Sequence, residues 1–319
     1  MEPLKLKAPC KDYLWGGTKL KTDYNQQSSA QKLAESWELS CHEDGLSEIA
    51  QGEYRGLTLK EYIEKAGRAV LGTDCGKFEQ FPILVKLIDA KDRLSIQVHP
   101  NNEYALKHEG GYGKTEMWYV VECEPDASLY YGFNRKITKD EFAQRIQHNT
   151  LLEVLHEVKV HPGDVFFIES GTLHAIGAGI LIAEIQQNSN STYRIYDYAR
   201  VGADGKPRQL HIEKALDVTK LEPSVPKPLA KREDLAGYSR TLLGSCEYFT
   251  VYEMEITESA AMNADGTSFH SLLCLDGTAE LYRDDKKLLT IEKGGSVFVP
   301  AGMGAYTLKG NCKLLFTRV

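Results

Sequence analysis

The chain has 319 residues, of which 42% are hydrophobic and 26% charged, a composition typical of a globular protein that buries a core of good size. Its formal net charge is −7 at pH 7 and it has no long basic run, which argues against a general nucleic-acid-binding protein but allows a locally positive pocket. No apolar stretch approaches the roughly 18 residues of a membrane span, the N-terminus has no signal-peptide core, and the 7 scattered cysteines form no C-x-x-C pair, so we expect a cytoplasmic protein with free thiols and no membrane partner.

Three segments predict helices, and much of the remaining chain predicts short strands separated by glycine, asparagine and aspartate turns. Residues 58–72, "TLKEYIEKAGRAVLG", place apolar side chains on one stripe. Residues 138–155 begin with Thr138 and Glu141 at the spacing of a capping box, and residues 211–221 form a shorter candidate. The predicted fold is therefore mainly β, with a few inserted helices.

Two later segments indicate a turn and a domain boundary. Residues 197–212, "DYARVGADGKPRQLHI", predict a hairpin that turns at Asp204–Gly205. Residues 222–233, "EPSVPKPLAKRE", contain three prolines and predict a linker. We therefore expect an N-terminal domain over residues 1–222, which carries the helical insertions, and a C-terminal domain over residues 223–319.

An internal repeat is the clearest organisational signal. Residues 162–179, "PGDVFFIESGTLHAIGAG", align without a gap on residues 293–310, "KGGSVFVPAGMGAYTLKG". Each copy has a glycine, an apolar strand, a turn of small residues and a second strand. The aligned glycines are Gly163 with Gly294 and Gly171 with Gly302. Two copies of this unit indicate two related β-barrels.

The two copies differ at one chemically important position. The first copy carries His174 after its turn, whereas the second has Ala305 at the equivalent place. We therefore expect the first barrel to hold the chemistry, and the C-terminal barrel to bind no catalytic metal and to act by packing.

Four side chains are candidate metal ligands. In "LSIQVHP" (94–100), apolar and polar residues alternate, so Gln97 and His99 point to the same face of a strand. Glu116 lies at the edge of the apolar run "MWYVV", where a carboxylate is costly unless it is paired or bound to a metal, and His174 follows a tight turn. Two imidazoles, a carboxylate and an amide oxygen suit one divalent ion: Zn²⁺ first, with an open position, and Fe²⁺, Mn²⁺ or Co²⁺ almost as well.

Charged side chains in apolar strands are candidates for substrate binding and proton transfer. Lys86 lies in "FPILVKLIDA", a poor place for an idle ammonium group, and Lys114 shares a strand face with Glu116. Arg194 follows Tyr193 and precedes Ile195. Glu184, in "GILIAEIQQ", is a candidate general base with a raised pKa or a buried ion-pair partner.

The motifs resemble those of a known family. The repeat unit, with "PGD" before it and "SGTLH" at its turn, resembles the cupin superfamily, which implies two jelly-roll barrels. The ordered motifs "YLWGG", "SWELS", "FPILVKLIDAKDRLSIQVHPN", "GKTEMWYVV", "GDVFFIESGTLHAIG" and "EIQQNSNSTYRIYD" are similar to type I phosphomannose isomerases, in particular the short bacterial form. The resemblance covers residues 10–220 in motifs and the remainder in overall plan.

The resemblance also implies roles for individual residues. One departure is Asn190, where many members of the family carry an Asp four residues before the arginine, because an asparagine cannot transfer protons. The implied metal ligands are Gln97, His99, Glu116 and His174; the implied catalytic residues are Arg194, Lys114 and Glu184; and the implied substrate-binding residues are Lys86, Trp15 and Asn190.

The resemblance implies interconversion of mannose 6-phosphate and fructose 6-phosphate through a cis-enediolate. The base that moves the proton stays open among Glu184, Lys114 and a metal-bound water. The alternatives are a cupin of another class, such as a dioxygenase, and a sugar-phosphate-binding regulator that lost turnover, for which Asn190 is the only support. We expect a small sugar phosphate as the partner, no nucleic acid, and a monomer or weak homodimer.

Overall fold

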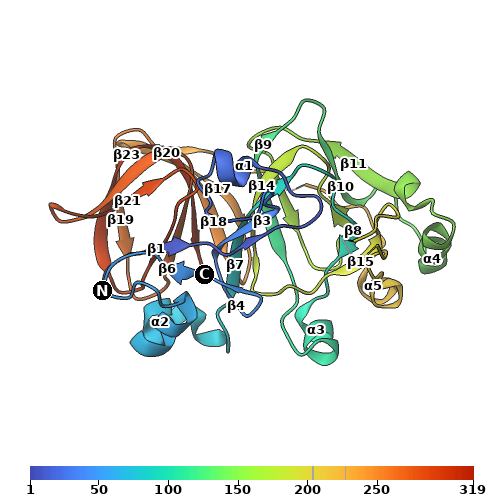
Figure 1. Ribbon diagram of the computed structural model, residues 1–319, viewed down its shortest axis with the longest axis horizontal. Coiled ribbons are helices and arrows are strands. Elements are labelled where there is room, and N and C mark those ends of the chain that lie inside the picture. Colours follow the sequence, from blue (N-terminus) through green and yellow to red (C-terminus); the bar gives the residue numbers. More distant parts are fainter. Residues whose placement is uncertain (203–204, 227) are drawn as a thin grey trace. The chain divides into compact units, whose positions relative to one another are not determined.

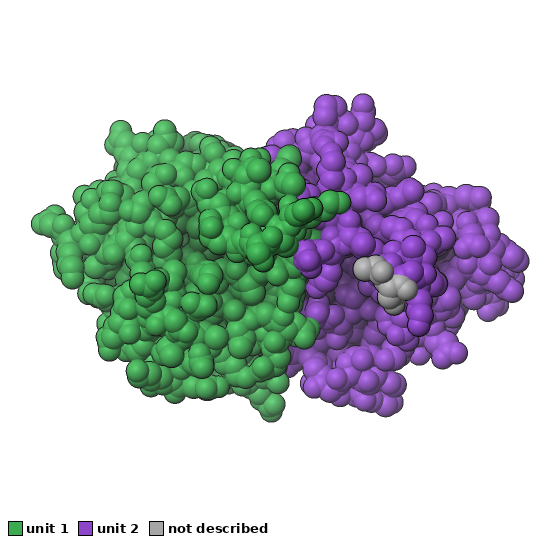
Figure 2. Space-filling model, in the orientation of Figure 1, with its two compact units in different colours: residues 1–11, 18–87, 228–319 green, residues 12–17, 88–227 purple. Residues whose placement is uncertain are grey.

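The computed structural model describes residues 1–202, 205–226 and 228–319, and its folded elements are mostly antiparallel strands (Figure 1). The chain divides into two compact units, coloured separately in Figure 2. Unit 1 contains residues 1–11, 18–87 and 228–319, and unit 2 contains residues 12–17 and 88–227. No helix in the described residues is long and apolar enough to cross a membrane.

Unit 1 contains a sheet in the order β16-β17-β18-β23-β20-β22-β1-β6, with β19 paired to β23 and β21 to β20. These strands are β1 (Leu4–Lys7), β6 (Glu48–Ile49), β16 (Glu233–Leu235), β17 (Tyr238–Ser245), β18 (Thr250–Ile256), β19 (Ser259–Ala264), β20 (His270–Arg283), β21 (Lys286–Glu292), β22 (Ser296–Val299) and β23 (Gly304–Arg318). The unit also holds β2 (Cys10–Lys11), β3 (Glu35–Leu39), β4 (Cys41–His42) and β5 (Gly45–Leu46). Strand β7 (Ile83–Ala90) continues from unit 1 into unit 2.

Both units are built from separate segments of the chain, whereas a single boundary after residue 222 was expected from the sequence. Strand β1 pairs antiparallel with β22, and Leu4 lies opposite Phe298. Strand β1 also pairs with β6, where Leu6 lies opposite Ile49. The N-terminal residues therefore belong to the sheet of the C-terminal barrel, a pairing over nearly the full chain length that local sequence patterns do not reveal.

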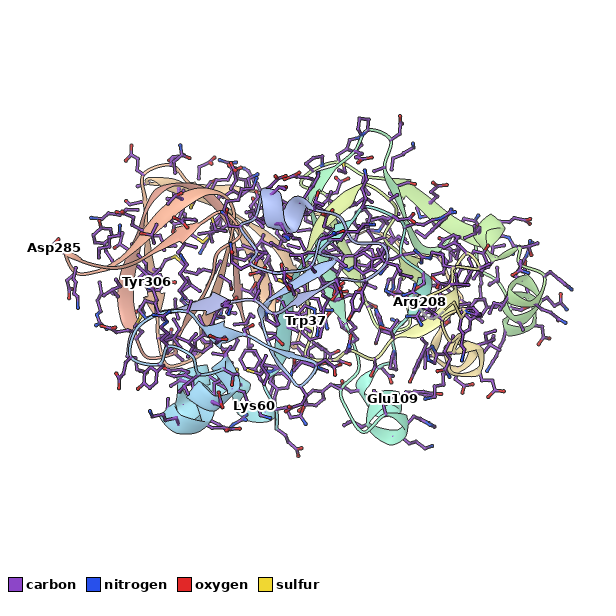
Figure 3. All side chains as sticks on the ribbon, viewed as in Figure 1. Trp37, Lys60, Glu109, Arg208, Asp285 and Tyr306 are labelled. Carbon is purple, nitrogen blue, oxygen red and sulfur yellow. The ribbon has the colours of Figure 1, made fainter. Side chains whose placement is uncertain are left out.

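The core of unit 1 is an apolar cluster between its strands. Leu272, Val297 and Leu314 are fully buried members of this cluster. Tyr306, labelled in Figure 3, is a buried member of the same cluster. Its hydroxyl group lies 2.9 Å from Nδ1 of the buried His270, so these two buried polar groups satisfy each other.

Unit 2 contains a five-stranded sheet in the order β11-β10-β13-β8-β15 and a second group in which β9 pairs with β12 and β14 (Figure 1). The strands are β8 (Ile96–Val98), β9 (Glu116–Cys123), β10 (Ser128–Phe133), β11 (Leu155–Lys159), β12 (Val165–Ile168), β13 (His174–Ala175), β14 (Ile180–Gln187) and β15 (Tyr193–Tyr196). All eight residues of β14 are buried, so both of its faces are covered.

The internal repeat has the same local structure in both units. Strand β12 of the first copy and β22 of the second occupy equivalent aligned positions. The aligned glycines all have positive φ: 95° at Gly163, 79° at Gly294, 86° at Gly171 and 77° at Gly302. Side chains other than glycine rarely adopt this conformation, which explains why both copies keep glycine at these turns.

The helices agree with the sequence in place but are shorter. The segment 58–72 forms α2 (Leu59–Ala66) and then a 3₁₀ helix, Arg68–Leu71. The segment 138–155 forms α4 (Lys139–Gln147) and a 3₁₀ helix, Leu151–Val154, and the Thr138 side chain caps α4 by accepting from the Glu141 amide at 3.1 Å. The remaining helices are α1 (Lys19–Thr22), α3 (Asn102–His108), α5 (Ile212–Val218) and a 3₁₀ helix at Thr73–Lys77.

One helix and one turn differ from the expected elements or lie partly outside the described residues. Helix α3 was not expected from the sequence; Asn101 caps it by accepting from the Tyr104 amide at 2.9 Å. The expected hairpin turn at Asp204–Gly205 includes Asp204, which lies outside the described residues.

Candidate active site

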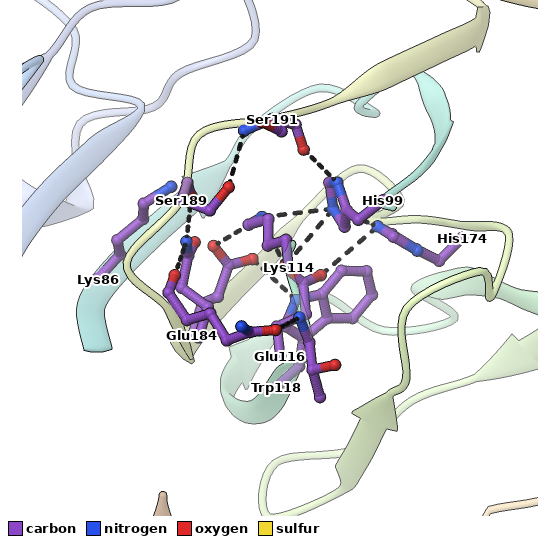
Figure 4. A network of polar contacts seen from close by, with 12 residues as sticks. Lys86, His99, Lys114, Glu116, Trp118, His174, Glu184, Ser189 and Ser191 are labelled. Atoms are coloured by element: carbon purple, nitrogen blue, oxygen red, sulfur yellow. Dashed lines mark hydrogen bonds and ion pairs between the residues drawn. The ribbon is translucent and has the colours of Figure 1, made fainter. Parts of the chain in front are cut away.

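Three of the four expected metal ligands meet in one buried cluster in unit 2. His99 follows β8, Glu116 begins β9 and His174 begins β13, and each side chain is at most 1% exposed. His99 Nε2 and His174 Nε2 are 3.1 Å apart, and they lie 3.6 Å and 3.5 Å from the two carboxylate oxygens of Glu116 (Figure 4). Among the described residues, this is the only group of three or more His, Cys, Asp or Glu side chains arranged to hold a metal ion.

The second nitrogen of each imidazole fixes its tautomer. His99 Nδ1 lies 2.9 Å from the carbonyl oxygen of Ser191, and His174 Nδ1 lies 2.8 Å from that of Thr172. A carbonyl oxygen only accepts, so each neutral ring must carry its hydrogen on Nδ1. Burial lowers the pKa of His174 to about 4, which keeps this ring neutral at pH 7. Two Nε2 lone pairs therefore face each other, and this arrangement needs a cation.

The spacing of the cluster fits a metal ion. A tetrahedron with bonds of ~2.1 Å to nitrogen and oxygen has edges of about 3.4 Å. The three distances between His99, Glu116 and His174 donor atoms are 3.1, 3.5 and 3.6 Å. The backbone carbonyls on Nδ1 are the outer partners that commonly orient imidazole ligands. Donor type, spacing and tautomer thus agree with a divalent ion held by these three residues.

Lys114 places a positive charge beside the same atoms. Its ammonium group lies 2.5 Å from Glu116 Oε2, 3.3 Å from His99 Nε2 and 3.5 Å from Glu184 Oε1. Only 4% of Lys114 is exposed. The ammonium group provides positive charge beside the Nε2 lone pair of His99. No such contact joins it to His174 among the described residues.

Glu184 lies beside this cluster on the neighbouring strand. Glu184 on β14 pairs directly with Trp118 on β9, and the Trp118 indole nitrogen donates to Glu184 Oε2 at 2.9 Å. The other carboxylate oxygen faces Lys114, and the residue is 3% exposed. Trp118 and Lys114 therefore hold the Glu184 carboxylate in place beside the candidate metal ligands. From the sequence, Glu184 was a candidate base or buried ion-pair partner.

Gln97 and Arg194 lie in one cross-strand row with His174. Gln97 on β8 is the direct partner of His174 on β13 and of Arg194 on β15. Directly opposed residues in antiparallel strands point to the same face, so the amide and the guanidinium extend the face that carries His174. The structure therefore brings Gln97 and Arg194 to the side of the sheet that carries the cluster.

The contacts of Arg194 leave its charge available. Its Nε donates to Ser95 Oγ at 3.3 Å and its Nη1 to the carbonyl oxygen of Gln209 at 3.0 Å, both neutral acceptors. Nearby Asp197 is bound instead by Arg200 and Arg208, at 2.5 and 2.6 Å. Burial, and next the charge of Arg208, lower the pKa of Arg194. Three guanidinium groups around one carboxylate leave an excess of positive charge, which favours an anion.

Lys86 lies in unit 1, and its partner was not expected from the sequence. Its ammonium group pairs with Glu35 Oε2 at 3.4 Å and lies 4.9 Å from the centre of the Trp37 ring. Trp37 also donates from its indole nitrogen to Glu35 at 2.8 Å. Glu35 is the first residue of "ESWEL" on β3, and the signal for its role was a carboxylate in a strand whose five residues are all buried.

The remaining candidates lie in loops. Trp15 is 4% exposed, in a turn of unit 2, and its carbonyl oxygen accepts from the Asp92 amide at 3.1 Å. Asn190 is exposed in the loop that follows β14. Their substrate-binding roles stay predictions.

Comparison with known proteins identifies the family of the sequence. Residues 4–122 match the family described as "Phosphomannose isomerase type I, catalytic domain". Residues 239–319 match "Mannose-6-phosphate isomerase, cupin domain". The cupin-type, mainly β fold predicted from the sequence is thereby confirmed.

Individual relatives agree over the whole chain. The mannose-6-phosphate isomerase ManA of Bacillus subtilis (strain 168) is 38% identical over 100% of this chain and 99% of its own length. A crystal structure of the mannose 6-phosphate isomerase from Bacillus subtilis superimposes with a TM-score of 0.93 at 35% identity, covering 100% of both chains. A zinc-bound mannose 6-phosphate isomerase shares the fold, with a TM-score of 0.79 at 18% identity over 99% of both chains.

Proposed function

The chain belongs to the type I phosphomannose isomerase family and is an aldose–ketose isomerase, and we propose that it interconverts mannose 6-phosphate and fructose 6-phosphate beside His99, Glu116 and His174. The single observation that carries the location is the pair of Nε2 atoms 3.1 Å apart, both with lone pairs directed at the same point. A redox-neutral isomerisation needs charge stabilisation and proton transfer, and the surrounding residues offer both.

His99, Glu116 and His174 would hold one Zn²⁺, with Gln97 as the fourth ligand. The cross-strand pairing of Gln97 with His174 supports this choice, since it aims an amide oxygen at the same face. When bound, the ion supplies positive charge beside the oxygens of the substrate and of the enediolate. Nitrogen and oxygen donors at this spacing suit zinc and would also accept other divalent transition metals.

Arg194 would bind the phosphate group of the substrate. Its guanidinium donates to two neutral acceptors, Ser95 and Gln209, and Asp197 is bound by Arg200 and Arg208. A guanidinium offers forked donors that match phosphate oxygens, which an ammonium group does not. Binding the phosphate there would orient the sugar relative to the metal ligands.

Glu184 would transfer the proton between C2 and C1. Trp118 fixes one of its oxygens, and the other faces Lys114 at 3.5 Å. Lys114 already contacts two carboxylates and His99, so its ammonium group suits a donor role, stabilising negative charge that develops on the enediolate. Taking the C2 proton and returning it at C1 needs one base on one face of the substrate, which a fixed carboxylate provides.

Elemental analysis of the purified protein together with a coupled assay for fructose 6-phosphate formation tests this function. We expect about one zinc per chain and turnover of mannose 6-phosphate that is lost on chelation and restored by Zn²⁺. Oxygen consumption by the iron-loaded protein without isomerase activity would favour a dioxygenase-type cupin. Sugar-phosphate binding without turnover at any metal loading would favour a regulator.

A further inference from the structure

Two buried amide oxygens near the cluster have no hydrogen-bond donor among the described residues: Gln186 Oε1 and Asn188 Oδ1. Gln186 is the penultimate residue of β14 and is fully buried, and Asn188 follows the end of the same strand and is 8% exposed. Buried acceptors of this kind are rare in folded proteins, because each one loses its hydrogen bond to water without a replacement.

The orientation of the Gln186 amide group is fixed by its neighbours. Its Nε2 donates to the carbonyl oxygens of Gln187 and Ser189, at 2.8 and 2.6 Å. Both partners can only accept, so the nitrogen must face them and the oxygen must point elsewhere. Gln186 Oε1 is thus an acceptor held in one direction, and only a donor can satisfy it.

The pairing of β14 with β9 places Gln186 on the face of the metal ligands. Gln186 lies directly opposite Glu116, just as Glu184 lies opposite Trp118. The Gln187 amide donates to the carbonyl oxygen of Thr115 at 3.0 Å, which continues the same register toward Lys114. Glu184 and Gln186 therefore share one face with Glu116 and Trp118, and Lys114 and Asn188 lie just beyond the ends of these two strands.

Lys114 carries a buried ammonium group two residues before Glu116, and its present position conflicts with a bound metal. Its ammonium group lies against His99 Nε2 and Glu116 Oε2, which are two of the proposed ligand atoms. One lone pair of His99 cannot serve an ammonium group and a metal ion at the same time. A metal that takes these atoms must leave Lys114 with donors that need new acceptors.

We propose that Lys114 has two positions: the one described here, beside His99 and Glu116, and a second one against Glu184, Gln186 and Asn188, which it takes when a metal binds to His99 and Glu116. The inference rests on the proposed metal site, and it makes Gln186 and Asn188 positioning residues. They act on metal binding by accepting the displaced ammonium group, which otherwise competes for the ligand atoms. They also hold Lys114 beside Glu184, where the reaction needs a donor.

Zinc affinity of the metal-depleted full-length chain tests the inference, measured by competition with a chromogenic chelator. The variants are Gln186→Met, Lys114→Met and the double variant. We expect Gln186→Met to weaken zinc binding about tenfold, the effect of losing one hydrogen bond from a charged group. Lys114→Met should bind zinc more tightly, because the competing ammonium group is gone. Adding Gln186→Met to Lys114→Met should then change the affinity no further.

Gln187→Met is the matched control. Gln187 is also buried, but it points to the opposite face and both ends of its amide are engaged: Oε1 accepts from the Thr115 amide at 2.8 Å and Nε2 donates to Asn102 at 2.9 Å. Its substitution should lower the melting temperature and leave zinc affinity unchanged. Asn188→Ala repeats the test at the end of the strand if Gln186→Met does not fold.

Two results would overturn the inference: unchanged zinc affinity in both Gln186→Met and Asn188→Ala, or an equal loss with and without Lys114. The second result would show that Gln186 acts directly on the metal or on the fold instead of through Lys114. Failure of the unaltered protein to bind zinc would be a different result, because it would reject the proposed metal site itself.

Discussion

His99 and His174 face each other with their Nε2 atoms 3.1 Å apart, while each donates from Nδ1 to a backbone carbonyl group. Neither ring can therefore donate to the other in its neutral form. The pair is a stable arrangement only if a cation lies between the rings or beside them. The carbonyl groups of Ser191 and Thr172 therefore preorganise the metal site, because they fix the tautomers of both histidines.

We predict that His174→Ala loses zinc and activity together. Removing one of the four proposed ligands leaves a single imidazole, a carboxylate and an amide oxygen, which do not hold a divalent ion against competing water at neutral pH. Bound zinc should fall from about one ion per chain to almost none, as measured by elemental analysis after gel filtration.

His270→Ala is the control for this prediction. His270 is also buried but contacts Tyr306 in unit 1. This variant should keep its zinc and lose only stability. Full zinc occupancy in His174→Ala, or loss of zinc without unfolding in His270→Ala, would contradict the proposed division of labour between the barrels.

We predict that Arg194→Lys loses function although it keeps the charge. The guanidinium donates to Ser95 and Gln209 while offering further donors to an anion, whereas an ammonium group lacks this fork. One lost charge-assisted hydrogen bond is worth roughly 1.5–3 kcal/mol, or about ten- to a hundredfold in kcat/KM for mannose 6-phosphate. Steady-state kinetics with zinc content checked in parallel measure the effect.

Arg145→Lys on the surface of α4 provides the comparison, since Arg145 pairs there with Glu141 and Glu153. Its kinetics should match those of the unaltered protein. Near-normal kcat/KM in Arg194→Ala would reject Arg194 as the phosphate-binding residue and would leave Lys86 and Lys114 as candidates.

The sequence could predict those parts of the site that depend on local pattern. Alternation placed Gln97 and His99 on one face of a strand. The repeat drew attention to His174, because the second copy has Ala305 at the equivalent position. These signals depend on two or three neighbouring residues, so they survive without knowledge of the fold. The family resemblance implied that His99, Glu116 and His174 bind one metal. The structure now places their donor atoms 3.1 to 3.6 Å apart.

The sequence could not predict the partners that long-range pairing creates. Lys86 was expected to be buried, but its partner Glu35 lies 51 positions earlier, and nothing local links them. Gln186 reads as an ordinary strand residue until its register with Glu116 is known. Helix α3 was missed because its seven residues lie between a strand and a glycine-rich segment, and Asn101 is a common turn residue as well as a cap.

We predict that Glu184→Gln lowers kcat by about a hundredfold or more, because a carboxamide cannot accept the proton and general base catalysis contributes about that factor. The shape and the hydrogen bond from Trp118 are kept, so folding should not change, and the kinetics are measured on the zinc-loaded variant. The KM for mannose 6-phosphate should change little, since the loss lies in the proton-transfer step.

Glu157→Gln is the matched surface variant, because Glu157 is exposed and accepts from Ser128 in the β10–β11 pair. It should be kinetically silent. An unchanged kcat in zinc-loaded Glu184→Gln would remove Glu184 as the base and would point to Lys114 or to a bound water.

We predict that the protein loses stability in acid because His270 in unit 1 is buried in its neutral form. Burial lowers the pKa of His270 to about 4, and the positive charge of Arg318 adds to the effect. The ordinary value of 6.5 applies in the unfolded chain, so between pH 6.5 and 4 the unfolded state binds the extra proton. Stability therefore falls as pH is lowered through this window, by about 2 kcal/mol between pH 7 and pH 5 from this one group.

Urea denaturation at pH 7 and at pH 5 measures this effect. Gln has no titrating group but keeps a donor and an acceptor for Tyr306, so His270→Gln should lose less stability on acidification than the unaltered protein, by about the same 2 kcal/mol. His148→Gln is the control, because His148 is exposed at the end of α4. His174 is present in every variant and cancels in the comparison. If His270→Gln and the unaltered protein lose equal stability between the two pH values, His270 is not the group that makes unit 1 sensitive to acid.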